Sequence, residues 1–485
     1  MAPDSELRAA WLLPSAYAKP ETNRRIRFNE RILSIEDEQG PAPNWLLMPP
    51  LANGHDHGRG LRPIAYGAAD APVECWVPAT YAMPPVDPYL VAAAALGRMA
   101  LSGIGHIVQC HLWRPPEILL QEAHAVRKAA EDVGVRVAFV VPLRDRHRLA
   151  YGADDDVLAC MQPDARQHVA ERFLRSIPPI DEQLAVADDI AAQCTSALFS
   201  VQLGPIGVEW CSDALLEAVA ARSLQDGPRV HMHLLESRYQ REWADAAFPG
   251  GIVQHLADVG LLSPRLAVAH GVWLRPQECA LLAQHGVTVS VNTSSNLRLR
   301  SGIAQLRDVH ASGARFALGL DALGLDDDDD MLREMRLARL LHSATGFEEA
   351  MSPADFLAAG TAHGTAVVCP EPAGQGIAPG ARADILAVDL SRITADLADG
   401  LFDPLTVIHA RATARDVARL VIGGRTIVGE GRVLGLDLPA IERELTAQLA
   451  AATPSLAEGR PLLLQFQEGL RRFYTEGRHK AGSRA

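Results

Sequence analysis

Short strand-like runs alternate with longer helix-like segments through most of this chain. Eight runs rich in apolar or β-branched residues occur at 47–53, 104–110, 135–143, 197–203, 229–233, 265–270, 287–292 and 314–320. Segments with apolar residues at helical spacing, such as DPYLVAAAALGRMAL, separate most of them. Eight strand–helix repeats over about 280 residues are typical of a (β/α)8 barrel. A doubly wound open sheet alternates in the same way, but it usually opens with a Gly-rich phosphate turn, and none follows the first runs.

The two flanks of the chain are patterned differently from its middle. Residues 24–48 alternate like a short strand pair, and residues 382–434 contain further strand-like runs around a Gly-rich bend. We therefore expect an α/β protein in which a TIM-like barrel carries a small β-sandwich domain built from both terminal segments. The predicted divisions are 1–48 for the N-terminal part of the β domain, 49–378 for the barrel, 379–437 for the C-terminal part of the β domain and 438–485 for a helical C-terminal extension.

Charge and composition exclude several classes of function. The chain has 46 Lys and Arg against 59 Asp and Glu, a net charge of −13, which is unsuitable for binding a nucleic-acid backbone. No uncharged apolar run reaches the length of a membrane span, and the N-terminus lacks the pattern of a secretory signal. The seven cysteines are scattered without a C-x-x-C motif, as expected of free thiols in a reducing compartment. We expect a cytoplasmic protein that binds neither nucleic acid nor membranes.

Groups that bind metals or transfer protons follow several of the predicted strands directly. In chain order they are His55, His57, His233, Glu236, His270 and Asp321. The C-terminal ends of all barrel strands converge on one mouth, so these side chains should become neighbours there. Three histidines and one carboxylate suit a divalent metal with an open position for water. Zinc is the first candidate, and iron, cobalt and manganese are alternatives.

The motifs around these residues resemble the amidohydrolase superfamily, in the branch that contains cytosine and guanine deaminases and triazine hydrolases. MPPLANGHDHGRG resembles the strand-one signature of that family, HMHLLES its strand-five signature and AHGVWL its strand-six motif. NTSSNLRLRSGIAQL and LGLDALGLDDDDDMLREMRLA resemble the segments at strands seven and eight. GQGIAPGARADILAVDL and VARLVIGGRTIVGEGRV resemble the C-terminal sheet. The similarity spans about residues 45–435, and the motifs occur in the order of the family.

The resemblance implies a role for each of these residues. The implied ligands of one divalent metal ion are His55, His57, His233 and Asp321. Glu236 would be the proton shuttle, His270 would polarise the attacking water or the substrate, and Asp321 would count among the catalytic groups as well. Relatives with two metals usually bridge them with a carboxylated lysine on strand four. No lysine lies between Lys128 and Lys480, which favours one metal per chain.

Further residues are candidates for contacts with a substrate or with the metal. His111 follows the second predicted strand, Asn296 lies after the seventh, and Trp76 lies on a loop after a strand end where it could line an apolar pocket. His231 precedes His233 by two residues and faces the same way in a regular strand, so it is an alternative ligand.

Water-dependent cleavage of a C–N bond is the predicted reaction. The first hypothesis is deamination of a small nitrogen heterocycle, because the H-x-x-E motif is retained. Hydrolysis of an amide, urea or carbamate at the same site is the alternative, which the unfamiliar strand-four segment GPIGVEWCSD and the Trp-rich loops favour. A non-catalytic barrel that acts as a binding module is a third hypothesis, but such a protein would be expected to lose ligands. We also expect a homo-oligomer.

Overall fold

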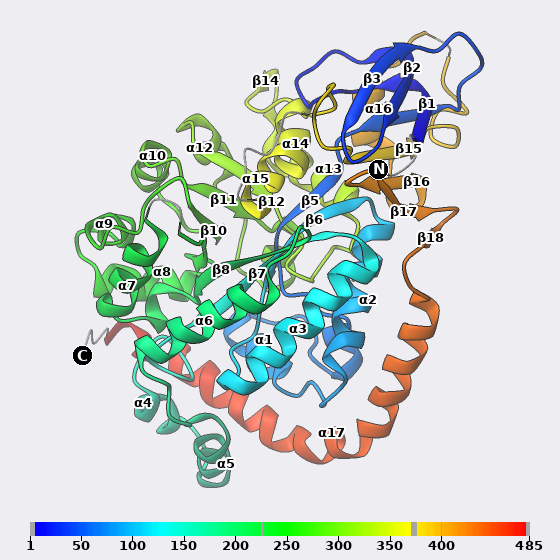
Figure 1. Ribbon diagram of the computed structural model, residues 1–485. Helices are drawn as coiled ribbons and strands as arrows, with labels where there is room; N and C mark the ends of the chain where they lie inside the picture. The colour runs from blue at the N-terminus through cyan, green and yellow to red at the C-terminus, as the bar shows by residue number, and fades with distance from the viewer. Residues whose placement is uncertain (1–4, 225–226, 370–375, 399, 482–485) are drawn as a thin grey trace.

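The computed structural model describes residues 5–224, 227–369, 376–398 and 400–481. Eight parallel strands follow one another around a near-closed barrel in chain order, with helices outside them (Figure 1). The strands are β5 (Leu51–Asp56), β6 (Ile104–Cys110), β7 (Arg136–Leu143), β8 (Phe199–Pro205), β9 (Val230–Leu234), β10 (Leu266–His270), β11 (Thr288–Val291) and β12 (Arg315–Leu318). Each overlaps one of the eight predicted runs, so the barrel prediction is confirmed.

The first predicted run, 47–53, spans two elements instead of one. Its start belongs to β4 (Trp45–Met48), its end belongs to β5, and Pro49 and Pro50 separate them. Proline cannot donate to a strand ladder, so the two residues end one strand and allow the chain to change sheet. One apolar segment therefore contributes to both sheets of the molecule.

The barrel closes where the end of β12 meets β5. The Asp321 amide donates to the His55 carbonyl at 3.0 Å, and the Leu320 amide donates to Asn53 Oδ1 at 2.9 Å. A side chain at Gly319 could not fit there, because a Cβ atom would lie 2.8 Å from the His55 carbonyl oxygen. This close approach joins the first and last strands and brings Asp321 beside His55.

Amphipathic helices cover the outside of the barrel. In α3 the buried residues Leu119, Ala123, Val126 and Ala130 recur at helical spacing and face the strands. The helices around the strands are α2 (Pro88–Leu101), α3 (Pro116–Val133), α6 (Ile180–Cys194), α7 (Asp213–Ser223), α8 (Arg238–Ala247), α9 (Ile252–Asp258), α10 (Pro276–Gln284), α12 (Leu306–Ala311) and α13 (Met331–His342). Further helices lie in connecting segments: α1 (Val73–Thr80), α4 (Asp154–Leu158), α5 (Pro163–Phe173), α11 (Thr293–Arg298), α14 (Pro353–Ala358), α15 (Gly364–Val368) and α16 (Pro404–Arg411).

Strands from both ends of the chain form the predicted small β domain. They lie in one mixed sheet in the order β18-β17-β16-β15-β4-β1-β2-β3. The two halves meet where β4 pairs antiparallel with β15, for example Met48 with Leu386. The strands besides β4 are β1 (Ser5–Leu12), β2 (Glu21–Phe28), β3 (Ile32–Asp37), β15 (Ile385–Asp389), β16 (Val417–Ile422), β17 (Arg425–Gly429) and β18 (Arg432–Val433).

A long C-terminal helix, α17 (Leu438–Thr475), runs from the small sheet across the loops at the barrel mouth (Figure 1). It contacts α1, α4 and α5, and near its end the Tyr474 hydroxyl accepts a hydrogen bond from the Tyr151 amide at 3.2 Å. Among the described residues, no helix combines the length and the apolar content that crossing a membrane requires. Every predicted segment contains residues outside this description: 1–4 in the N-terminal segment, 225–226 and 370–375 in the barrel, 399 in the C-terminal part of the β domain and 482–485 in the extension. Residues 374–375 are the first two of GQGIAPG.

A buried ion pair joins the barrel to the small sheet. Asp384 accepts hydrogen bonds from the Gly423 amide at 2.6 Å and from Arg136 Nη2 at 3.3 Å, and it lies 3.5 Å from His106 Nε2 on β6. Burial opposes a charge on His106, but hydrogen bonds with Asp384 and Cys369 outweigh it and raise the pKa of His106 to about 9.

We expect this histidine to make stability depend on pH above neutrality. Its pKa is higher in the folded than in the unfolded chain, so its contribution, on the order of 3 kcal/mol, is complete below about pH 6.5 and is lost as the pH rises through 9. The thermal midpoint of the wild type should fall over that interval, and His106→Asn should remove most of the fall. His168→Asn on α5 is the control. Equal slopes for the wild type and His106→Asn would contradict the expectation.

Candidate metal centre at the barrel mouth

Five of the six residues predicted at strand ends carry ligand atoms that gather at the mouth. His55 is the second-last residue of β5, His233 lies in β9, and His270 ends β10, while His57 and Asp321 follow β5 and β12. Nitrogen atoms of His55, His57 and His233 lie within 4.8 Å of one another, and so do ligand atoms of His55, His270 and Asp321. The fold therefore brings together the residues that the spacing of motifs predicted as neighbours.

Backbone carbonyl groups orient two of these imidazoles. Nδ1 of His57 donates to the Cys110 carbonyl at 2.9 Å, and Nδ1 of His233 donates to the Ile206 carbonyl at 2.8 Å. Both Nε2 atoms are consequently unprotonated in the neutral rings and lie 3.4 Å apart. Oδ1 of Asp321 lies 3.2 Å from His57 Nε2. Such backbone support for the far nitrogen is the usual arrangement of metal-binding histidines.

His55 supplies the test of whether a metal fits. Its side chain is fully buried, and its Nε2 atom has no hydrogen-bond partner within the described chain. That atom lies 3.4 Å from Asp321 Oδ1. Burial holds the pKa values of His55 and His233 well below 6.5, so both rings are neutral, as ligands must be. A buried lone pair without a partner is costly, and a cation between these groups would satisfy it.

His231 lies behind His55 and supports it. The distance from His231 Nε2 to His55 Nδ1 is 2.9 Å, and the two rings are stacked with an interplanar angle of 9°. Cys110 Sγ lies 3.4 Å from the same His55 nitrogen. A donated hydrogen bond from His55 Nδ1 to His231 leaves His55 Nε2 facing the cluster. His231 thus faces the barrel interior, as its spacing from His233 predicts, and its contact is with a candidate ligand.

Left-handed backbone conformations occur at the ends of two strands that carry site residues. His270 has φ of 72°, Asp321 has φ of 54° and Ala322 has φ of 55°. Non-glycine residues seldom adopt such values unless the surroundings compensate. At Ala322 the backbone amide donates to Asp56 Oδ2 at 3.0 Å. The carboxylate of Asp56, which lies between His55 and His57 in the sequence, therefore holds the turn that directs Asp321 into the mouth.

Glu236 lies beside His270 rather than among the clustered nitrogen atoms of His55, His57 and His233. Its Oε2 atom is 3.8 Å from His270 Nε2, and Ser301 Oγ donates to its Oε1 atom at 3.4 Å. Burial, followed by the nearby carboxylates, raises the pKa of Glu236 to about 7 although His270 opposes the rise. A carboxyl group with a pKa near neutrality can both accept and donate a proton, which is the property of a general acid–base.

The residues predicted to contact substrate have contacts of other kinds. Asn296 Oδ1 accepts from His270 Nδ1 at 2.9 Å. His111 Nε2 lies 2.6 Å from Glu122 Oε2 on α3. Trp76 is buried in α1 beneath the Arg59 guanidinium, which lies 4.8 Å from its ring centre. Their roles toward a substrate remain predictions.

Buried polar groups after β8 and in α8 were missed by the sequence reasoning. Glu209 accepts a hydrogen bond from Gln240 Nε2, and Gln240 Oε1 accepts from the Glu236 amide at 2.5 Å. Burial raises the pKa of Glu209 to about 7. The signal was the unfamiliar segment GPIGVEWCSD, which contains Glu209. Inside the barrel, Gln202 of β8 donates to the Val367 carbonyl at 2.8 Å. β8 contains no lysine that could bridge two metal ions.

We expect His231→Ala to weaken metal binding about 10–100-fold, because His55 loses the group that orients it. His231→Gln, which keeps an acceptor, should retain most of the affinity, and His310→Ala on α12 is the control.

His233→Ala should instead lose the metal and turnover, because a candidate ligand itself is removed. Chelator competition measures all four variants. Full occupancy in His233→Ala, together with an empty site in His231→Ala, would make His231 the ligand.

Comparison with known proteins agrees with this geometry. The sequence profile of the Amidohydrolase family matches residues 46–427. A 5-methylthioadenosine/S-adenosylhomocysteine deaminase of Pyrococcus horikoshii is 28% identical over 427 residues, covering 86% of this chain and 91% of that protein. A 5′-deoxyadenosine deaminase of Methanosarcina barkeri is 31% identical over 235 residues, covering 48% of this chain. That match spans 53% of the length of the Methanosarcina protein.

Solved structures share the whole fold. A zinc-bound adenosine deaminase of Xanthomonas campestris superposes with a TM-score of 0.73 at 22% identity, covering 92% of this chain and 98% of that one. An atrazine chlorohydrolase of Arthrobacter aurescens with zinc gives 0.75 at 19% identity, covering 92% and 99%. The family profile covers most of the chain and agrees with the resemblance seen in its motifs. This protein therefore belongs to the amidohydrolase family and is a hydrolase that acts on C–N bonds of a small-molecule substrate.

Proposed function

We propose that this hydrolase is a zinc-dependent deaminase that releases ammonia from a small amino-substituted nitrogen heterocycle. The observation that carries the proposal is the position of Glu236, a buried carboxyl group with a raised pKa beside both His270 and the histidine cluster. The similarity to a 5-methylthioadenosine/S-adenosylhomocysteine deaminase over 86% of this chain supports an adenine-type ring as the first substrate to test.

The metal would be held by Nε2 atoms of the three histidines and by a carboxylate oxygen: His55, His57, His233 and Asp321. When bound there, a divalent ion would lower the pKa of a water molecule toward neutrality. Zinc in two structural neighbours supports zinc as the ion. One ion per chain agrees with the absence of any lysine between Lys128 and Lys480, a range that includes all of β8.

Side chains of the protein would transfer the protons and orient the substrate. Glu236 takes the proton of the attacking water and delivers it to a ring nitrogen or to the departing amine. His270, which Asn296 orients through Nδ1, presents Nε2 to the same space and can hydrogen-bond the reacting centre. Ser295 donates to Asp321 Oδ2 at 2.5 Å and so fixes which oxygen of that carboxylate faces His57.

We expect the purified protein to contain about one zinc ion per chain and to lose activity when a chelator removes it. Elemental analysis combined with an ammonia-release screen of adenine-type nucleosides, aminotriazines, amides, ureas and carbamates tests the proposal. Two ions per active chain, or none with activity intact, would contradict the metal assignment. Turnover of amides, ureas or carbamates without turnover of heterocyclic amines would replace deamination by the alternative chemistry.

We expect Glu236→Gln to lower kcat by roughly 10²–10⁴ while KM stays within about tenfold of the wild type. The amide keeps the shape and the hydrogen bonds of the carboxyl group but cannot carry a proton. Metal content measured on the same preparation should be unchanged. A near-normal kcat with a metal affinity weakened about 10–100-fold would show instead that Glu236 only supports a ligand.

A further inference from the structure

A buried arginine beside the candidate metal centre has no counter-ion. Arg59 follows His57 by two residues, and only 8% of its surface is accessible. Its guanidinium lies over the ring of Trp76, 4.8 Å from the ring centre. Within the described residues, its Nε atom has no hydrogen-bond partner and no carboxylate forms an ion pair with it. Arginine keeps its charge at neutral pH and buried charges are normally paired, so this side chain calls for an anion.

Two more hydrogen-bond donors adjoin this guanidinium. The Tyr66 hydroxyl, in the 3-10 helix η1 (Pro63–Tyr66), and Nε1 of Trp76 are buried, and neither has a partner in the part of the chain that the structure describes. Burial raises the pKa of the Tyr66 hydroxyl while the charge of Arg59 opposes the rise, as expected of groups that lie close together. Guanidinium and indole groups donate hydrogen bonds but accept none. What these three side chains, here called the donor cluster, lack is an acceptor.

The donor cluster flanks the candidate metal ligands on two sides. Arg59 lies in the loop after β5 that also carries His57. Trp76 packs in one apolar cluster with Leu323, which follows Asp321 by two residues. The Cα atoms of residues two apart in a chain are separated by at most about 7 Å. A group bound by the donor cluster would therefore belong to a molecule that also reaches the metal centre.

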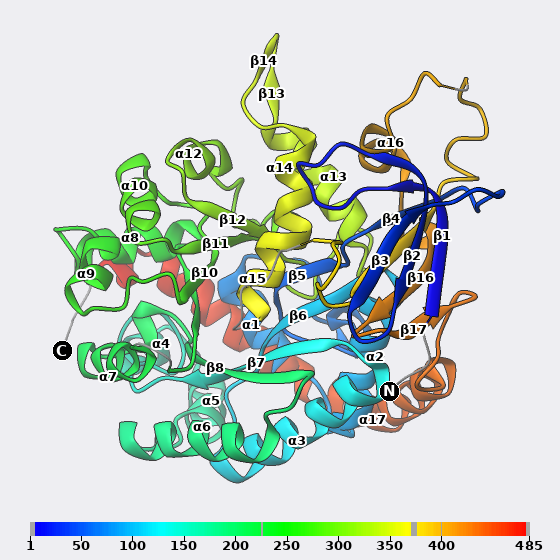
Figure 2. The same cartoon turned by 45° about the horizontal axis from the view of Figure 1, so that its top comes forward.

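The helix that carries Trp76, α1, has its acidic side chain engaged elsewhere. Ser237 Oγ, next to Glu236 in the chain, donates to Glu74 Oε1. The C-terminal helix α17 lies beside α1 (Figure 2), and Gln467 Nε2 donates to the Cys75 carbonyl at 2.8 Å. Contacts on two sides thus fix α1, and its carboxyl group is bound beside the proposed proton shuttle and does not pair with Arg59.

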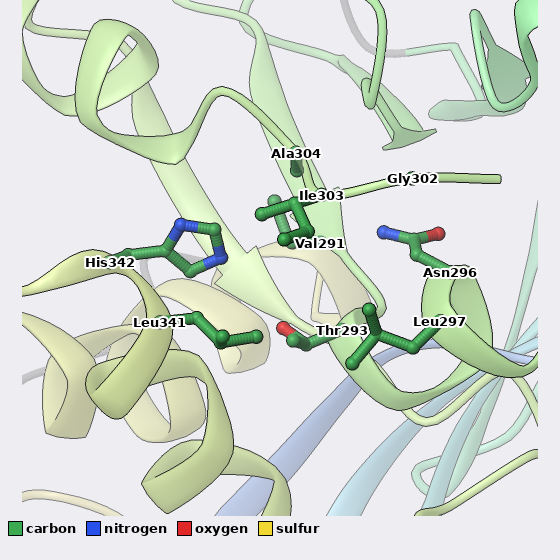
Figure 3. A pocket seen from close by; sticks show the side chains of 9 residues that line it. All are labelled: Val291, Thr293, Asn296, Leu297, Gly302, Ile303, Ala304, Leu341 and His342. Carbon is green, nitrogen blue, oxygen red and sulfur yellow. The ribbon is translucent and has the colours of Figure 1, made fainter. Parts of the chain in front are cut away.

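Two other features at the mouth are poorer places for an anion. Arg144 also lies over a tryptophan, 4.9 Å from the ring centre of Trp210, but its Nη2 atom donates to the His147 carbonyl. The small hollow beside α11, which Figure 3 shows, has a mostly apolar lining. Its titratable side chain, His342, is neutral at pH 7 because burial lowers its pKa to about 4.

We propose that the donor cluster binds a carboxylate or phosphate group of the substrate, so that the preferred substrate is an anionic amino-substituted heterocycle. The inference deepens the proposed deaminase function and rests on it for the reacting ring. A planar guanidinium can donate two parallel hydrogen bonds to either kind of anion, and stacking on Trp76 fixes the plane of these bonds. The anion would supply the acceptor and the counter-charge that the cluster lacks.

Two matched pairs of adenine-type compounds test the inference on the zinc-loaded enzyme. Adenosine and adenosine 5′-monophosphate differ by a phosphate, and 5-methylthioadenosine and its carboxymethylthio analogue differ by a carboxylate. The wild type should turn over one anionic member with a kcat/KM ~30-fold or more above that of its neutral partner, because hydrogen bonds between charged groups are strong. The pair that responds identifies the anion. Equal kcat/KM values within both pairs would overturn the inference.

Arg59→Gln should lower kcat/KM for the preferred anionic member ~30–100-fold and leave that of its neutral partner within about threefold of the wild type. Arg59→Lys, which keeps the charge but loses the planar fork, should be intermediate. Arg144→Gln, the matched control, should leave the ratio of the two members unchanged. Because an unpaired buried cation is removed, the thermal midpoint of Arg59→Gln should be maintained or raised. Equal losses for both members, with a lower midpoint and lower zinc content, would assign Arg59 to the fold and overturn the inference.

Binding of simple anions separates the failure of this inference from that of the proposed function. At equal ionic strength, inorganic phosphate or acetate should raise the thermal midpoint of the wild type more than that of Arg59→Gln, because a ligand held only by the folded state stabilises it. This difference in a protein that deaminates no heterocycle would refute the proposed function and keep the anion site. Deamination without preference for the anionic members and without this difference would overturn the inference and keep the proposed function.

Discussion

The close approach of the last barrel strand to the first determines both the fold and the site. The backbone hydrogen bond from Asp321 to the carbonyl of His55 closes the barrel and places a carboxylate beside an imidazole. Asn53 reinforces this junction from within the strand-one motif, and Asp56 holds the following turn. Asn53 and Asp56, which flank His55 and His57 in the sequence, therefore take part in the closure, and the candidate metal ligands come together only when the barrel is closed.

The interior around this junction is almost free of solvent, which determines how its charges behave. Burial holds the pKa values of His55 and His233 well below 6.5, and it raises the pKa of Glu236 to about 7. Burial also gives every ring nitrogen without a hydrogen-bond partner a cost in free energy. The groups that hydrogen-bond the candidate ligands are therefore as necessary to the site as the ligands themselves. His231, the Ile206 carbonyl and the Cys110 carbonyl each leave one ring nitrogen facing the centre.

The barrel and most of the candidate site could be predicted because both depend on local pattern and order along the chain. Strand runs such as 135–143 can be recognised in the sequence by their apolar and β-branched residues. The histidines can be recognised because they stand at or directly after the ends of such runs. The change of sheet at Pro49, the left-handed turn at Ala322 and the position of His231 behind His55 depend on packing between segments far apart in sequence. Glu209 was missed because a glutamate in a loop carries no periodic signal, and only its burial makes it notable.

The pairing of β4 with β15 has a consequence for the order in which the protein folds. Met48 lies opposite Leu386, so the strand that leads into the barrel has no partner on that side until most of the chain has left the ribosome. Contacts this distant in sequence form slowly, because the entropy of closing a long loop must be overcome first. During that interval the edge of β4 that β15 later covers stays unpaired. A nascent chain of this protein should therefore be a substrate for chaperones until its C-terminal sheet strands are synthesised.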